Sequence, residues 1–253
     1  MGSLKGKRAL VTGGGQGLGA AIALELAARG ADIAVHFHSS GAGAKGVADA
    51  ARRLGVRAEI FSADLSREDE ASRLVAGVAA FLGGLDVLVN NVGDLVGRKM
   101  LSEIDAAFWR TVMDVNVDSM LYVTRAAVPH LARARGASIV NLSSLAGRKG
   151  GHPGSLAYST AKGAVLAWTR ALAAELGPQG IRVNALAPGL ILGTRFHATH
   201  TTPESAERTV AGIPLGRAGQ PEDVARAAAF LAGEYDGFIT GATLDINGGA
   251  YCA

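Results

Sequence analysis

The chain has 253 residues, a formal net charge of +3, one cysteine and 35 glycines; 49% of its residues are hydrophobic, 5% aromatic and 19% charged. This length fits one or two domains, and the hydrophobic fraction can form a large core, which excludes a disordered chain. The glycine share is about twice the usual ~7%, but without a G-X-Y period, which excludes a collagen-like chain. With a single cysteine, Cys252, we expect no intrachain disulfide and no metal site built from cysteines.

The charge distribution and the hydropathy pattern argue against nucleic acids and membranes as partners. Basic and acidic residues are interspersed, and no run of five basic residues occurs. Nucleic-acid-binding proteins usually concentrate their basic residues in one stripe, so we expect no nucleic-acid partner. No segment offers ~18 consecutive apolar residues for a membrane span. Residues 1–8 are not followed by the apolar stretch of a secretory signal. We therefore expect a cytoplasmic protein that does not bind membranes.

Short β-rich runs alternate with longer amphipathic runs along the whole chain. The predicted strands span residues 8–12, 31–37, 57–63, 85–90, 137–142, 181–186 and 242–246, and the predicted helices include residues 20–29, 67–82, 108–133, 157–176 and 221–232. Most of the strands are continuously apolar, which indicates a parallel sheet covered by helices on both faces. The pattern predicts an α/β fold: one doubly wound Rossmann-type domain over residues 1–253, with a seven-stranded parallel sheet flanked by helices.

One long stretch, residues 188–219, has no clear periodicity and is rich in Gly, Thr, His and Pro. It is too long for an ordinary connection, so it is either a functional lid or an irregular surface loop. We expect a substrate lid over residues 190–219.

A glycine-rich turn follows the first predicted strand. Residues 12–19 read T-G-G-G-Q-G-L-G and lead into a helix. Glycines at such a turn permit close approach of the backbone to a pyrophosphate, and the helix N-terminus supplies N–H donors. The G-x-G-x-x-G fingerprint does not fit in any register; the pattern is T-G-x-x-x-G-x-G. A Walker A loop is excluded because no Lys-Ser/Thr pair follows the glycines. The alternative is a merely flexible turn.

The end of the second predicted strand bears on the choice of cofactor. An acidic residue there would hydrogen-bond the ribose 2′-OH of NAD, but residues 36–40 read H-F-H-S-S. Without a carboxylate to repel it, a 2′-phosphate is tolerated, and His38, Ser39 and Ser40 could donate to it. No arginine stands there, and Gln16 is neutral. We predict NADP(H) as the preferred cofactor, with NAD(H) as the alternative.

A candidate catalytic pair lies in the predicted helix 157–176. Tyr158 and Lys162 are four residues apart and therefore share one face of the helix. A nearby ammonium favours the phenolate and lowers the tyrosine pKa from its usual ~10. Ser144 follows a predicted buried strand, and carboxyl ends of strands are where open α/β sheets bind ligands. Asn116 lies in an otherwise apolar helical stretch.

These motifs, taken in order, resemble the short-chain dehydrogenase/reductases across essentially the entire chain. The matching features are T-G-x-x-x-G-x-G at residues 12–19, Asp64, N-N-x-G at residues 90–93, Asn116, Ser144, Tyr158-x-x-x-Lys162, and Pro188-Gly189. The resemblance implies hydride transfer between a nicotinamide cofactor and a small carbonyl or alcohol substrate. It also implies a homotetramer packed through helices 108–133 and 157–176.

The resemblance implies a role for each matched residue. Tyr158 would be the general acid in reduction, Ser144 would hydrogen-bond the substrate oxygen, and Lys162 would bind the nicotinamide ribose and lower the tyrosine pKa. Asn116 would hold a water of a proton relay, Asp64 would contact adenine, and Asn90 and Gly93 would line the adenosine ribose side. The predicted catalytic residues are Asn116, Ser144, Tyr158 and Lys162. The predicted cofactor-binding residues are Gly13, Gln16, Gly17, Leu18, Gly19, His38, Ser39, Ser40, Asp64, Leu65, Asn91, Val92, Gly93, Tyr158, Lys162, Pro188, Gly189 and Ile191.

The sequence departs from the family pattern at a few positions. Val92 replaces the usual alanine of N-N-A-G. The spacing from Ser144 to Tyr158 is one residue longer than the commonest one, which leaves Ser143 as an alternative catalytic serine. The family often has a threonine five positions after the proline of Pro188-Gly189, whereas Gly193 stands there and Thr194 follows. The threonine contact to the cofactor is therefore open.

The substrate class is open at this point. The three loops expected around the substrate (residues 94–100, 145–157 and 190–212) carry mainly basic residues: Arg98, Lys99, Arg148, Lys149, His152, Arg195, His197 and His200. These are either solvated loop charges or a site for an acidic or carrier-linked acyl substrate. Similarity to 3-oxoacyl-(acyl-carrier-protein) reductases favours the latter. The alternatives are a sugar, polyol or other small-alcohol dehydrogenase, and a non-catalytic dinucleotide-binding scaffold.

Overall fold

A seven-stranded sheet forms the centre of the computed structural model, which describes residues 4–233 and 237–252. All neighbouring strands are parallel, in the order β3-β2-β1-β4-β5-β6-β7. The strands are β1 (Arg8–Val11), β2 (Asp32–Phe37), β3 (Ala58–Ser62), β4 (Val87–Asn90), β5 (Ala137–Leu142), β6 (Ile181–Pro188) and β7 (Thr243–Ile246). Each lies at a predicted position, so the predicted α/β fold and parallel sheet are confirmed.

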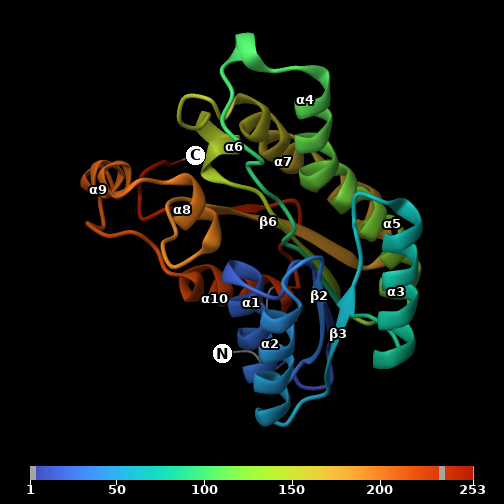
Figure 1. The fold of residues 1–253 in the computed structure, drawn as a ribbon. Coiled ribbons are helices and arrows are strands. Elements are labelled where there is room, and N and C mark those ends of the chain that lie inside the picture. The colour runs from blue at the N-terminus through green and yellow to red at the C-terminus, as the bar shows by residue number, and fades with distance from the viewer. Residues whose placement is uncertain (1–3, 234–236, 253) are drawn as a thin grey trace.

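Helices cover both faces of this sheet. They are α1 (Gly17–Ala28), α2 (Gly41–Arg53), α3 (Glu68–Leu82), α4 (Ala106–Met113), α5 (Ser119–Leu131), α6 (Leu145–Lys149), α7 (Leu156–Leu176), α8 (Arg195–His200), α9 (Pro203–Ala211) and α10 (Pro221–Ala232). Short 3₁₀ turns span Leu101–Glu103 and Gly177–Gln179. Figure 1 shows α1, α2 and α10 on one side of the sheet and α3, α5 and α7 on the other. Among the described residues, no helix is both long and apolar enough to cross a membrane.

Alternating side chains of the strands form the two core layers. In β1, Ala9 and Val11 pack with α1, α2 and α10, whereas Leu10 packs with α3, α5 and α7. All three side chains are fully buried. Both faces of the central strands are therefore apolar, which is why these strands read as continuous hydrophobic runs.

The predicted helix 108–133 contains a local irregularity. It comprises α4, a π-helical turn over Asp114–Asp118, and α5. Asp105 caps α4 by accepting a hydrogen bond from Phe108 N. A π turn inside an α-helix is rare and is frequently found at a functional site; here it carries Asn116.

The stretch 188–219 is more regular than its lack of periodicity predicts. It contains the helices α8 and α9, whose N-caps are Thr194 and Thr202. Ala206 and Val210 of α9 pack on Leu190 and Ile213. These helices argue against the irregular surface loop, and they are too short to show a periodic pattern in the sequence; the substrate lid stays a prediction.

Candidate active site

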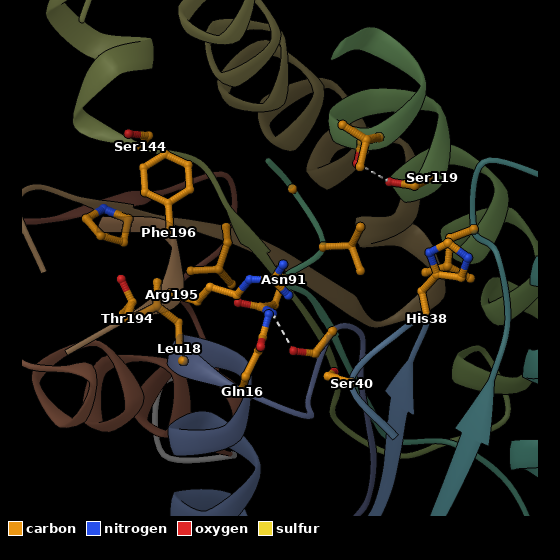
Figure 2. Close-up of a pocket in the computed structure, with 18 of the residues that line it drawn as sticks. Gln16, Leu18, His38, Ser40, Asn91, Ser119, Ser144, Thr194, Arg195 and Phe196 are labelled. Atoms are coloured by element: carbon orange, nitrogen blue, oxygen red, sulfur yellow. Dashed lines mark hydrogen bonds between the residues drawn. The ribbon is translucent and has the colours of Figure 1, made fainter. Parts of the chain in front are cut away.

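A cleft of about 360 Å³ follows the carboxyl ends of the strands, where the loops after β1 to β6 meet. Figure 2 shows Ser144 and Phe196 at one end of this cleft, His38 at the other, and Gln16 and Leu18 between them. The crevice beyond the carboxyl ends of the strands is the ligand-binding position of open α/β sheets.

The glycine-rich turn forms the floor of the cleft. Helix α1 begins at Gly17, whose φ is +54°, and no side chain caps its first turn. The N–H groups of this turn therefore have no side-chain acceptor and are suited to a phosphate. A Cβ at Gly19 would collide with the carbonyl oxygen of Gly13, so this glycine permits the close packing of the helix on the turn. Gly19 lies outside the cleft lining, and its contact with the cofactor stays a prediction.

His36 holds the turn in place from β2. Gly13 N donates to His36 Nδ1 at 3.1 Å, and His36 Nε2 lies 3.0 Å from Ala63 O. These partners require the neutral tautomer with a proton on Nε2, because Nδ1 accepts and the carbonyl can only accept. Burial lowers the pKa of His36 to about 4, which keeps the ring neutral. No role was predicted for this histidine from the sequence; its position at the end of a strand beside the turn was the available signal.

The far end of the cleft carries hydroxyl groups, an imidazole and a carboxylate. His38 and Ser39 are exposed, and Ser40 is half-buried, with its Oγ within 2.5 Å of where a Cβ at Gly15 would stand. Asp64 accepts hydrogen bonds from the Ser66 hydroxyl at 2.7 Å and the Ser66 N–H at 3.0 Å, which lower its pKa. The predicted adenosine-side residues His38, Ser39, Ser40, Asp64 and Leu65 all line this end.

Ser144 and Tyr158 lie at the opposite end. Ser144 follows β5 and caps α6 by accepting a hydrogen bond from Ala146 N. Tyr158, in the first turn of α7, is half-buried and hydrogen-bonds to Ser144. Burial raises the pKa of Tyr158 to about 12, and the bond to Ser144 opposes this rise. Ser143 is turned away, because its hydroxyl donates to Lys162 O at 2.7 Å.

Lys162 lies under the tyrosine. Its ammonium is 5.8 Å from the centre of the Tyr158 ring and donates to Leu142 O at 2.9 Å. The residue is only 4% exposed, and this burial lowers its pKa to about 8. Gly93 faces it so closely that a Cβ there would lie 2.6 Å from Lys162 Nζ. The ammonium is therefore held in one place by the end of β5 and by the loop after β4.

Asn116 fixes that loop from the π turn. Its Nδ2 donates to Asp94 O at 2.8 Å and to Val112 O at 2.9 Å, and its Oδ1 accepts from Asp94 N at 3.2 Å. Both amide protons are thus used for backbone contacts. A Cβ at Gly93 would lie 2.8 Å from Asn116 Oδ1, so the amide and the lysine ammonium both approach this glycine. The side chain itself lies outside the cleft lining.

Helix α8 covers the catalytic end. Phe196 packs on Tyr158 with ring centres 5.7 Å apart, and His200 Nε2 lies 3.3 Å from Asp94 Oδ1 across the opening. Thr194, at the start of α8, is buried and approaches Gly17: a Cβ at Gly17 would lie 3.6 Å from Thr194 Cβ. The segment predicted as a lid thus bridges the glycine turn and the tyrosine.

The cleft brings most of the predicted site residues together. Its lining includes Gly13, Gln16, Gly17, Leu18, His38, Ser39, Ser40, Asp64, Leu65, Asn91, Val92, Gly93, Ser144, Tyr158, Lys162, Pro188, Gly189 and Ile191. It also contains residues that were not predicted as cofactor contacts, among them Thr194, Arg195 and Phe196. Asn90 was expected at the ribose side, but its Nδ2 donates to Thr124 and Asn141 in the interior, so that expectation was wrong.

Comparison with known proteins gives the class of protein that this fold and site define. A family model described as enoyl-(acyl carrier protein) reductase matches residues 13–251. The 3-oxoacyl-(acyl-carrier-protein) reductase of Staphylococcus aureus is 37% identical over 97% of this chain and 98% of its own. The structure of an NADH-dependent reductase responsible for alginate metabolism aligns with a TM-score of 0.91 and 35% identity, covering 99% of each chain. A short-chain dehydrogenase from Burkholderia cenocepacia in complex with NADP aligns with a TM-score of 0.91 and 35% identity, covering 98% of each chain.

The chain belongs to the short-chain dehydrogenase/reductase family. It is an NAD(P)(H)-dependent oxidoreductase that acts on CH–OH and C=O groups.

Proposed function

We propose that the protein interconverts a carbonyl and a secondary alcohol with Tyr158 as the general acid and base and with NADP(H) as the preferred cofactor. The observation that carries the proposal is the single cleft in which the glycine turn, Ser144, Tyr158 and Lys162 meet. The bound nicotinamide supplies or accepts the hydride. The site fits such a group, because the cleft of about 360 Å³ runs from the uncapped N-terminus of α1 to Tyr158 and Lys162.

Tyr158 and Ser144 act on the substrate oxygen. A phenol is protonated at neutral pH, and burial, which raises the pKa of Tyr158 to about 12, reinforces this, so it can donate a proton as the carbonyl oxygen gains negative charge. The Ser144 hydroxyl, next to the phenol, stabilises the same developing charge. A resident proton on a buried phenol suits reduction better than oxidation, in which the tyrosine must first lose that proton.

Lys162 and Asn116 support the tyrosine from below. With a pKa of about 8, the lysine carries its proton at neutral pH, so its positive charge favours the phenolate that forms as Tyr158 gives up its proton. We propose that Asn116 positions the lysine through the loop at Gly93, and that the water of the relay lies beside it. The Asn116 Oδ1 retains a lone pair for such a contact, whereas both Nδ2 protons are used.

The preference for NADP(H) rests on the end of β2. No carboxylate stands at residues 37–40, and His38, Ser39 and Ser40 line the cleft there. These groups can donate hydrogen bonds to a 2′-phosphate, and none of them repels it. The ratio of kcat/KM with NADPH to that with NADH tests the preference. A ratio well above one is expected; comparable values, or a preference for NADH, would overturn it.

For the substrate we propose a 3-oxoacyl thioester, on the basis of the identity to the reductase of S. aureus. A sugar, polyol or other small neutral carbonyl compound is the second candidate, and an observation on the loops favours it. Arg148 pairs with Asp245, Lys99 pairs with Asp105, and Arg98 donates to carbonyl oxygens. Three of the cations expected to attract an acidic substrate therefore already have protein partners.

An NADPH-oxidation screen separates these candidates. The panel contains acetoacetyl thioesters, neutral ketones and sugar-derived carbonyl compounds, each measured with the wild-type protein and with Tyr158→Phe as the blank. Turnover of the thioester is the expected result. Turnover confined to neutral compounds would replace the first candidate by the second, and no tyrosine-dependent turnover across the panel would exclude both.

We also propose a homotetramer. The family resemblance supports it, and so do the apolar side chains exposed on α4, on α7 and on the 3₁₀ turn before α4. Leu101 is 73% exposed, Leu156 45% and Trp109 37%. Burial of such side chains between subunits removes apolar surface from water. Light scattering that gives the mass of a monomer would contradict this proposal.

A further inference from the structure

Arg195 differs from the arginines and lysines of the loops around the cleft. In the part of the chain that the structure describes, its guanidinium has no hydrogen-bond or ion-pair partner, whereas Arg98, Lys99, Arg148 and Lys149 all have one. Arg195 lines the cleft, and Figure 2 shows its side chain extending toward the middle of the cleft, where Asn91 is labelled. The side chain is thus a positive charge directed at a ligand site, with no hydrogen-bond or ion-pair partner among the residues that the structure describes.

The backbone on both sides of Arg195 is anchored. Thr194, just before it, approaches Gly17 at the start of α1, and the Thr194 hydroxyl accepts a hydrogen bond from His197 N at 3.3 Å. Phe196, just after it, packs on the Tyr158 ring. Residue 195 therefore lies between the glycine turn and the catalytic tyrosine, which is the central part of the cleft.

The ligand of this cleft brings two negative charges to that central part. NAD(P)(H) carries a pyrophosphate between its two nucleosides, and the N-terminus of α1 offers it only backbone N–H groups and the partial positive charge of the helix. Among the residues that line the cleft, the lysines and arginines are Lys162 and Arg195. Lys162 is buried at the catalytic end and donates to Leu142 O. Arg195 is therefore the cation available to the phosphates.

We propose that Arg195 binds the pyrophosphate of the cofactor from the lid side, opposite the N–H groups of the glycine turn. The planar guanidinium can donate two parallel hydrogen bonds to phosphate oxygens. This assignment deepens the proposed function, since it rests on the dinucleotide site, and it moves Arg195 from the expected acidic-substrate loops to the cofactor. The assignment also makes the start of α8 part of the cofactor site, next to Phe196, which packs on Tyr158.

The test is the Kd of NADPH and of NADH, measured by fluorescence titration without substrate for the wild type, Arg195→Gln and Arg195→Lys. Arg208→Gln is the matched control, because Arg208 is an exposed arginine on the next helix and lies outside the cleft lining. The lost charge-assisted bonds should weaken both cofactors by the same factor, about 10-fold or more, since both contain the pyrophosphate. The Arg195→Lys variant should bind both cofactors more tightly than Arg195→Gln does, and Arg208→Gln should bind them as the wild type does.

Adenosine 2′-monophosphate, which lacks the pyrophosphate, is the second probe, and its Kd should be the same for the wild type and Arg195→Gln. Unchanged Kd values for both cofactors would overturn the proposal. A loss confined to NADPH, with weaker binding of adenosine 2′-monophosphate, would overturn it in favour of a 2′-phosphate contact. A raised KM for the carbonyl substrate with unchanged cofactor affinity would overturn it in favour of substrate recognition. Since no turnover is needed for the titrations, they remain decisive if the proposed catalytic function fails.

Discussion

Replacing Gly93 by alanine tests how tightly the catalytic end is packed. The new Cβ would lie 2.6 Å from Lys162 Nζ and 2.8 Å from Asn116 Oδ1. Non-bonded heavy atoms prefer separations of about 3.5 Å or more, so the ammonium has to retreat by about 1 Å. Its retreat is opposed by the 2.9 Å hydrogen bond to Leu142 O and by the burial of the residue. The methyl group therefore displaces the lysine from its place beneath Tyr158.

A displacement of this size has a predictable kinetic effect. Misplacing a positioned group by ~1 Å costs about 100-fold in rate, so kcat of Gly93→Ala should fall by about that factor. Gly163→Ala is the control: it adds the same methyl next to Lys162 in the sequence, where it meets only Gly147 O at 3.5 Å. Steady-state kcat and the Tm of both variants are the measurements. If Gly93→Ala turned over as fast as Gly163→Ala with a similar Tm, the argument from packing would be refuted.

Two further predictions concern pH. The rate of carbonyl reduction should decline above about pH 8, because the buried Lys162 loses its proton there; a kcat/KM profile that stays flat well above this pH would contradict the role of the ammonium. The free energy of unfolding should fall as the pH drops from about 6.5 to about 4, because unfolded chains protonate His36 in this window while burial keeps the folded ring neutral. The contribution of the neutral His36 ring to the free energy of unfolding is fully present above pH 6.5 and amounts to about 3 kcal/mol at most. Denaturant unfolding of the wild type and His36→Asn across this range checks it, since equal pH dependence in both would exclude His36 as the source.

The sheet could be predicted from the sequence because its strands are buried on both faces. In β5, every residue of Ala137–Leu142 is buried, and the predicted bounds of this strand match those observed. Helix α10 was predicted with its observed bounds as well, since Pro221, Glu222 and Asp223 mark its first turn. An apolar run and a set of first-turn residues each involve only residues that are close in the sequence, so a single sequence is enough to detect them.

Helices α2 and α8 lacked that kind of signal, and the start signal that α9 carries was not used. Helix α2 contains three glycines, and a Cβ at Gly43 would collide with the carbonyl oxygen of Gly15, so tertiary packing rather than helix propensity selects that residue. Helix α8 has only six residues. Helix α9 does begin with Thr202, Pro203 and Glu204, a capping residue followed by two good first-turn residues, and this start signal could have been used.

The direction of individual side chains was the part of the site that motifs alone did not determine. Asn90 pairs in register with Asn141 across β4 and β5, and its side chain points into the interior, so the next residue, Asn91, faces the cleft. The partners of the loop cations were also hidden, because Asp245 is 97 residues from Arg148. Whether Arg195 faces the cofactor or the substrate likewise depends on the fold.

The most direct test of the account is the comparison of Tyr158→Phe with the wild type in two measurements on the same samples. Turnover of the carbonyl substrate should fall by about 10³-fold or more, because the proton donor at the substrate oxygen is lost. The Kd of NADPH should be unchanged, since the glycine turn, Lys162 and Arg195 are intact. Substantial residual turnover in Tyr158→Phe would contradict the assignment of this residue as the general acid and base.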